Sequence, residues 1–164
     1  MFGTRLRRRG SGGAAPAAES RVGSAAPALS GDSLIGEGTL DLTSMEGKPT
    51  VVVFWFPECP HCQESIPALQ AAWPEVAAEA NILTVGMVRN DPDLEVTPGY
   101  ETPQAFVATT HLALPTLLTD WVTQSARWRL EGVPTVFLLD EDQIVRRVMT
   151  NPEPSAVLAA VSSL

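Results

Sequence analysis

The chain has 164 residues, 45% of them hydrophobic and 6% aromatic, which is enough for one globular domain with a substantial core. The formal charge of −8 is unevenly distributed, because five of the eleven basic residues lie in the first 21 positions beside a single acid. The remainder carries six basic and eighteen acidic side chains, a net charge of −12, which argues against nucleic acid as a partner. No stretch approaches the roughly 18 consecutive apolar residues that a transmembrane segment needs.

Residues 1–36 are rich in Ala, Gly, Pro and Ser and show no hydrophobic periodicity. We therefore expect a disordered N-terminal tail over residues 1–36, followed by one domain over residues 37–164. The arginines at 7–9 resemble the start of an export signal and residues 25–28 resemble a cleavage zone, but the apolar segment between them is missing. The compartment stays open: resemblance to known families, described below, favours a location outside the cytoplasm, and the alternative is cytoplasmic.

Beyond the tail, strand and helix patterns alternate. Apolar runs rich in β-branched residues predict strands over residues 38–42, 50–56, 81–88, 114–118, 135–140 and 144–149. Helical patterns, several of them opening on proline, cover residues 60–72, 75–80, 103–112, 123–130 and 155–161. The strands at 50–56 and 81–88, joined by a helix, predict a parallel βαβ unit, whereas the last two strands predict an antiparallel hairpin.

The only two cysteines, Cys59 and Cys62, lie where the strand over residues 50–56 gives way to a helix. With two residues between them, the thiols can close a small disulfide ring, and Pro60 suits the first helical turn. The positive end of the helix dipole favours a thiolate, which is the nucleophile of disulfide exchange. The pattern predicts a redox site in which Cys59, nearer the helix start, is the nucleophile and the more buried Cys62 resolves the mixed disulfide.

The order of the elements, with the cysteine pair opening the first long helix, resembles the thioredoxin fold, an α/β three-layer architecture with a central mixed β-sheet flanked by helices. Residues 54–62 look like the family's aromatic strand end and CxxC motif, Pro67 matches its helix-kinking proline, and Val133-Pro134-Thr135 looks like its cis-proline loop. The extra helix and residues 114–120 are similar to the TlpA/ResA/DsbE-like branch and to related redoxins. The resemblance covers residues 38–164.

This resemblance implies a thiol–disulfide oxidoreductase that acts on protein thiols without a metal or organic cofactor. Its implied partners are client proteins carrying thiols or disulfides and an unidentified redox partner, and we expect a monomer. Val133 and Pro134 are the implied substrate contact, since the Val133 backbone can pair with an extended client peptide.

Three residues depart from the family pattern. Glu58 stands where the family usually has Trp, and its carboxylate is expected to raise the pKa of Cys59. Val53 and Ser65 stand where thioredoxin and ResA carry carboxylates that handle the proton of the second thiol. Their absence weakens the interpretation as a reductase.

Pro60 and His61 are the pair found between the cysteines of DsbA-like oxidases. Pro60 lacks an N–H and His61 can carry positive charge beside the thiolate, and stabilising the reduced form makes a disulfide more oxidising. We therefore favour oxidation of clients, with disulfide reduction of the TlpA/ResA kind as the alternative.

Three other uses of the thiols stay open. Zinc needs four ligands, and the only histidines are His61, inside the cysteine loop, and His111. A copper-binding module without catalysis is an alternative from a different class. A peroxidase would follow a Pro-x-x-x-Thr/Ser-x-x-Cys pattern, but Phe56 stands three places before Cys59, and no arginine is evident near the site.

Overall fold

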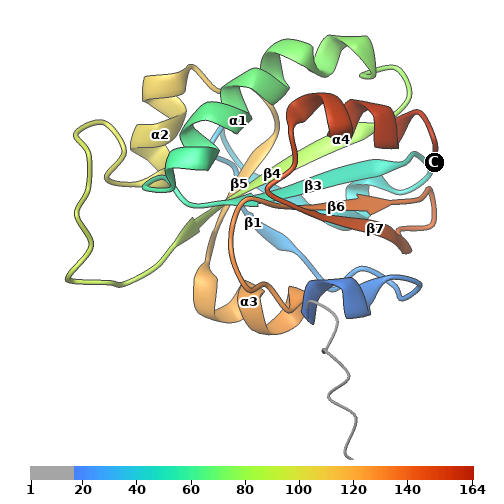
Figure 1. Cartoon of the computed structure of the whole chain (residues 1–164), viewed down its shortest axis with the longest axis horizontal. Coiled ribbons are helices and arrows are strands. Elements are labelled where there is room, and N and C mark those ends of the chain that lie inside the picture. The colour runs from blue at the N-terminus through green and yellow to red at the C-terminus, as the bar shows by residue number, and fades with distance from the viewer. Residues whose placement is uncertain (1–16) are drawn as a thin grey trace, which may run out of the picture.

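A five-stranded mixed sheet forms the centre of the protein, seen in a computed structural model that describes residues 17–164 (Figure 1). Its strands, in the spatial order β5-β4-β3-β6-β7, are β3 (Thr50–Trp55), β4 (Asn81–Val88), β5 (Thr116–Asp120), β6 (Thr135–Leu139) and β7 (Val145–Thr150). The α-helices are α1 (Pro60–Ala72), α2 (Pro103–Thr110), α3 (Trp121–Trp128) and α4 (Pro154–Val161). Strands β1 (Ser30–Asp32) and β2 (Thr39–Asp41) form a separate antiparallel pair, and the short 3₁₀ helices are η1 (Ala17–Arg21), η2 (Leu42–Met45) and η3 (Trp73–Glu75).

The sheet is covered on both faces, which gives three layers (Figure 1). Along β3, Val51 and Val53 pack into a core shared with α1, α2 and α4, whereas Val52 and Phe54 pack into a second core with Trp128 of α3 and the N-terminal segment. This split follows from the two-residue side-chain period of a strand. All six residues of β3 are buried, as expected for a central strand covered on both sides. The predicted α/β three-layer fold is confirmed.

The pairing of the strands determines where the cysteine pair lies. β3 pairs with β4 in parallel and β4 with β5 in parallel, as the predicted βαβ unit requires, while β6 and β7 form the predicted antiparallel hairpin. Parallel neighbours end at the same edge of the sheet. The segments that leave β3, β4 and β5 therefore meet at one edge, and the cysteine pair lies there.

The N-terminal segment departs from the expectation. Residues 1–16 lie outside the described residues, but the segment from residue 17 onward packs on the domain, with Ala18 only 6% and Leu29 2% exposed. Ser33 forms a bridge with Leu117 of β5, and a Cβ on Gly31 would lie 2.3 Å from the carbonyl oxygen of Leu118. The expected domain start at residue 37 is wrong for residues 17–36. Backbone pairing and the close approach of a glycine need no apolar periodicity, so the composition did not reveal them.

Three helix predictions also need correction, the first being that α3 (Trp121–Trp128) begins and ends two residues before the predicted 123–130. Residues 75–80 are not a helix, because η3 ends at Glu75 and a series of turns leads to β4. Helix α2 ends at Thr110, two residues before the predicted end, because His111 adopts a left-handed conformation with φ of 52°. That conformation caps the helix and redirects the chain toward β5.

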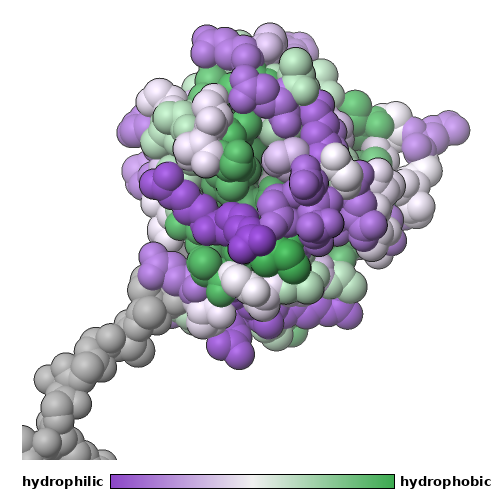
Figure 2. Space-filling view, turned by 90° about the vertical axis from the view of Figure 1, so that its right-hand side faces the viewer, coloured by the Kyte–Doolittle hydropathy of each residue, from purple (hydrophilic) through white to green (hydrophobic). Residues whose placement is uncertain are grey.

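The two ends of the sheet carry different segments of the chain (Figure 1). Figure 2 shows the end that carries the β6–β7 turn and the C-terminus, where hydrophilic and hydrophobic side chains are interleaved. The cysteine pair lies at the other end of the sheet. Among residues 17–164, no helix is both long enough and apolar enough to cross a membrane.

Candidate active site

Cys59 caps the N-terminus of α1. Its backbone is extended, with φ of −77° and ψ of 116°, and its Sγ accepts a hydrogen bond from the backbone N–H of Cys62 at 3.2 Å. Pro60 occupies the first helical position, where a missing N–H leaves no hydrogen bond unmade. The sulfur of Cys59 therefore lies at the positive end of the helix dipole.

The two thiols differ in burial and in acidity. Cys59 is half-buried, whereas Cys62 is 0% exposed, and both thiols are free. Hydrogen bonding from the Cys62 thiol, aided by its N–H and by the positive charge that His61 carries when protonated, outweighs burial and lowers the pKa of Cys59 to about 7. Burial, and then the neighbouring Cys59 sulfur, raise the pKa of Cys62. Cys59 is consequently the thiol that ionises first.

The loop before β6 faces the nucleophile candidate. The Val133–Pro134 peptide bond is cis, as the sequence predicts, and the carbonyl oxygen of Val133 lies 3.9 Å from Sγ of Cys59. The hydroxyl of Thr135 donates to the carbonyl of Gly132 at 2.7 Å, and the N–H of Asn151 donates to the carbonyl of Pro134 at 2.8 Å. These bonds hold the Val133 backbone beside the sulfur.

The comparison with known families agrees with this geometry. Residues 22–148, more than half of the chain, match the AhpC/TSA family. The chain belongs to the AhpC/TSA family. This finding and the relatives described next confirm the resemblance to the TlpA/ResA/DsbE-like proteins of the thioredoxin fold.

Known relatives of this AhpC/TSA member include the thiol-disulfide oxidoreductase ResA of Halalkalibacterium halodurans, 25% identical over 119 residues. That match covers 73% of this chain, which spans only 62% of the relative's length. The fold is also that of a secreted Mycobacterium tuberculosis disulfide oxidoreductase homologous to Escherichia coli DsbE, with a TM-score of 0.65 and 21% identity over 83% of this chain and 96% of the other. A DsbF homologue from Corynebacterium diphtheriae has a TM-score of 0.69 and 17% identity, over 86% and 87% of the two chains.

Glu58 has a partner that sequence analysis missed. Its Oε1 lies 2.7 Å from Nε of Arg89, and Cζ of Arg89 lies 4.7 Å from the ring centroid of Phe56. Among the charges that act on the buried Cys62, that of Glu58 raises its pKa further, after burial and the Cys59 sulfur. Arg89 therefore opposes the charge of Glu58, a contact that the sequence did not reveal, and the statement that no arginine lies near the site is wrong.

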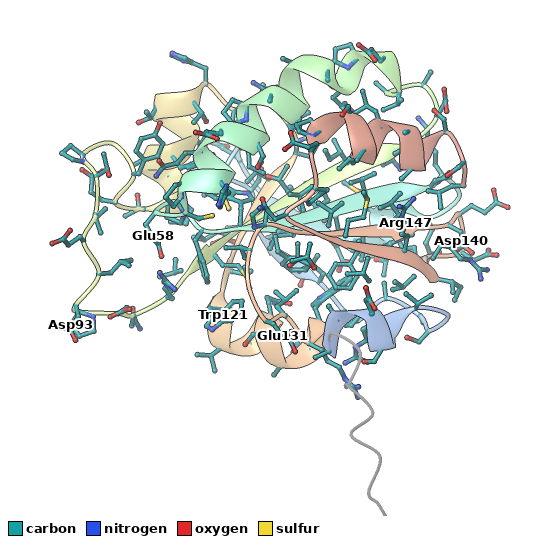
Figure 3. All side chains as sticks on the ribbon, in the orientation of Figure 1. Glu58, Asp93, Trp121, Glu131, Asp140 and Arg147 are labelled. Atoms are coloured by element: carbon teal, nitrogen blue, oxygen red, sulfur yellow. The ribbon has the colours of Figure 1, made fainter. Side chains whose placement is uncertain are left out.

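The sequence carried part of the signal for Arg89, namely its place at the same sheet edge as Glu58, but not its contact with that residue. Arg89 is the first residue after β4, which is the parallel neighbour of β3, and Glu58 follows β3 by three residues. Residues that directly follow adjacent parallel strands lie at the same sheet edge. Figure 3 shows Glu58 and Trp121, which follows β5, at that end of the sheet.

Two hollows flank the cysteines of this AhpC/TSA member. One, of about 280 Å³, is lined by His61, Glu64, Asn151 and neighbouring residues between α1 and the β7–α4 connection. The other, of about 200 Å³, lies under the loop over residues 89–102 and is lined by Glu58, Arg89 and apolar residues that include Val96. The residues that line them include Glu58, directly before Cys59, and His61, between the two cysteines.

A third, small cavity lies beside Pro134. It has a volume of about 10 Å³, at the lower limit for one water molecule, and its lining includes Val53 and Ser65 but no carboxylate. The hydroxyl oxygen of Ser65 is buried without a hydrogen-bond partner. Neither Val53 nor Ser65 therefore offers a carboxylate that could accept the proton of the second thiol.

Metal ligation would need further ligands beside the two thiols. Among residues 17–164, no three His, Cys, Asp or Glu side chains come together in a group that could hold a metal ion. The zinc and copper alternatives therefore gain no third ligand of these types in the part of the chain that the structure describes.

Proposed function

We propose that the protein is a thiol–disulfide oxidoreductase that exchanges disulfides with client proteins through Cys59 and Cys62, in the oxidising direction. The observation that carries the exchange chemistry is the Cys59 sulfur itself. It is accessible, it caps a helix, and it accepts the Cys62 N–H at 3.2 Å, beside a fully buried second thiol. The ResA relative is named for the same class of reaction.

The proposed oxidation runs through a mixed disulfide. A client thiolate attacks Sγ of Cys59 in the Cys59–Cys62 disulfide, the S–S bond breaks, and Cys62 leaves and takes up a proton. A second client thiolate then attacks the client sulfur of the mixed disulfide and expels Cys59 as a thiolate. The client loses two electrons, the enzyme gains them as a dithiol, and a redox partner that accepts two electrons restores the enzyme disulfide.

The asymmetry of the two thiols favours this direction. The last step expels Cys59, whose pKa of about 7 makes it a good leaving group. A reductase must instead release its client by attack of a Cys62 thiolate, and burial raises the pKa of that thiol. With Val53 and Ser65 in place of carboxylates, the reducing direction has no acidic side chain at those positions to accept the Cys62 proton.

We further propose that clients bind as extended peptides against the Val133 backbone, with Pro134 shaping the loop and His61 helping to stabilise the thiolate. The two open hollows beside Glu58 and His61 supply room for the flanking client residues. A monomer is sufficient for this mechanism. An oxidising role fits a compartment outside the reducing cytoplasm.

Equilibration of the Cys59–Cys62 disulfide in glutathione buffers tests the direction. We expect a potential well above the roughly −270 mV of thioredoxin, toward the roughly −120 mV of DsbA. A thioredoxin-like potential would assign the protein to the reductases instead. The Cys59→Ser variant is expected to lose exchange with reduced RNase or with insulin while keeping the fold, and retained turnover would contradict the assignment of the nucleophile.

A further inference from the structure

Glu58 is an enclosed carboxylate immediately before the proposed nucleophile. Its side chain is 9% exposed, and its Oε1 forms an ion pair with Nε of Arg89 at 2.7 Å. An enclosed carboxylate is far less screened by water than a surface one, so its charge reaches the neighbouring sulfurs. Whether that charge is neutralised therefore matters for any thiolate formed beside it.

Arg89 is held in place from two sides. Its Nε contacts Glu58, and its Cζ lies 4.7 Å from the centroid of the Phe56 ring, an arrangement that cation–π attraction favours. The Phe56 ring in turn packs on Trp121, with ring centroids 5.1 Å apart. The guanidinium thus has a defined position at the end of the sheet where the cysteines lie.

The charges around Glu58 are unbalanced without Arg89. The hollow under the 89–102 loop is lined by the carboxylates of Glu58, Asp91 and Glu101, and among its described lining residues Arg89 is the single cation. His61, in the first turn of α1, also favours the Cys59 thiolate when it carries a positive charge. Loss of Arg89 would leave the three carboxylates of this hollow without a cation among its lining residues.

We propose that Arg89 is a positioning residue that neutralises Glu58 and thereby favours the thiolate of Cys59 and the reduced form of the pair. The inference rests on the proposed thiol–disulfide exchange. It assigns to the residue after β4 an electrostatic role in the reaction, exerted through Glu58 rather than by contact with a client.

An electrostatic role and a purely structural role of Arg89 predict different signs for the shifts of the Cys59 pKa in the two single variants. In Arg89→Met, the Glu58 charge is unopposed, and a like charge nearby disfavours the thiolate, so the Cys59 pKa rises by roughly one unit. In Glu58→Gln, the Arg89 charge is unopposed and the Cys59 pKa falls by a comparable amount. In the double variant both charges are gone, and the pKa returns to within about 0.3 units of the wild-type value. If the pair only held the loop in place, both single variants would shift the pKa in the same direction.

The measurement is the pKa of Cys59 in the reduced full chain, from thiolate absorbance and from the pH dependence of alkylation. Arg146→Met is the matched control, because Arg146 makes the same kind of ion pair, Nε to Oδ2 of Asp140 at 2.7 Å. Figure 3 shows Asp140 at the opposite end of the sheet from Glu58, so this variant should leave the Cys59 pKa unchanged.

Two outcomes would overturn the inference: shifts of the same sign in Arg89→Met and Glu58→Gln, or no shift in either. Exchange with reduced RNase, measured on the same proteins, distinguishes failure of this inference from failure of the proposed function. If the pKa values move in opposite directions but the wild type oxidises no client, the proposed function fails and the role of Arg89 stands. If the wild type exchanges normally and the pKa values do not move, only the role of Arg89 is wrong.

Discussion

Replacement of the Cys62 thiol tests the origin of the acidity of Cys59. Hydrogen bonding from that thiol is the largest cause that lowers the pKa of Cys59 to about 7. Cys62→Ala removes the thiol donor and keeps the backbone N–H that Sγ of Cys59 accepts at 3.2 Å. A hydrogen bond to a charged group contributes about 1.5–3 kcal/mol, and one pKa unit corresponds to about 1.4 kcal/mol. Because a thiol is a weak donor and Cys59 is only half-buried, the lower end applies, and we expect a rise of about one unit.

The assay is a titration of thiolate absorbance against pH. Cys59 is the sole thiol in a Cys62 variant, so the absorbance step reports on it alone. Cys62→Ser is the matched control, since its hydroxyl replaces the donor and should hold the Cys59 pKa near that of the wild type. Equal pKa values in the Ala and Ser variants would refute the reasoning and would leave the helix N-terminus as the cause of the low pKa.

Three further predictions concern the wild type and the core. The pKa of Cys59 is lowered to about 7, so its thiolate is present above pH 7 and lost as the pH falls through that value. The alkylation rate of the reduced protein should therefore fall about tenfold per pH unit below 7 and level off above it; a rate still rising steeply at pH 8.5 would contradict this. Gly31→Ala places a Cβ 2.3 Å from the Leu118 carbonyl oxygen and should lower the free energy of unfolding by about 1–3 kcal/mol in urea, whereas an unchanged midpoint would mean that residues 30–32 do not pack on β5. Trp128→Ala removes a side chain that is 0% exposed and packs on two phenylalanine rings at 5.1 and 4.8 Å, and it should lower the same free energy by about 3–5 kcal/mol; a loss below 1 kcal/mol would not fit a residue of the core.

The elements around the cysteines could be predicted because their signals are local. Helix α1 has the predicted bounds, Pro60–Ala72, since a proline in the first turn and the Trp73-Pro74 pair after the last turn mark both ends. Strand β4 also has its predicted bounds, because its apolar run is bounded by polar residues on both sides. The prediction was wrong over residues 75–80, where helix-forming residues lie in a segment that must turn within a few residues to enter β4.

The sequence alone determined the CxxC motif and its place at a strand-to-helix junction, because both depend on residues that are near neighbours in the chain, and the resemblance to the thioredoxin fold implied the three-layer architecture. Only the tertiary structure decided that residues 17–36 pack on the sheet and that Glu58 meets Arg89 across 31 positions of sequence. Both contacts depend on which strands are neighbours and on how closely their backbones approach. Hydrophobic periodicity gives no information about the distance between two backbones or about a contact between two side chains. The electrostatic surroundings of Cys59 were therefore visible only once the edges of β3 and β4 had been placed side by side.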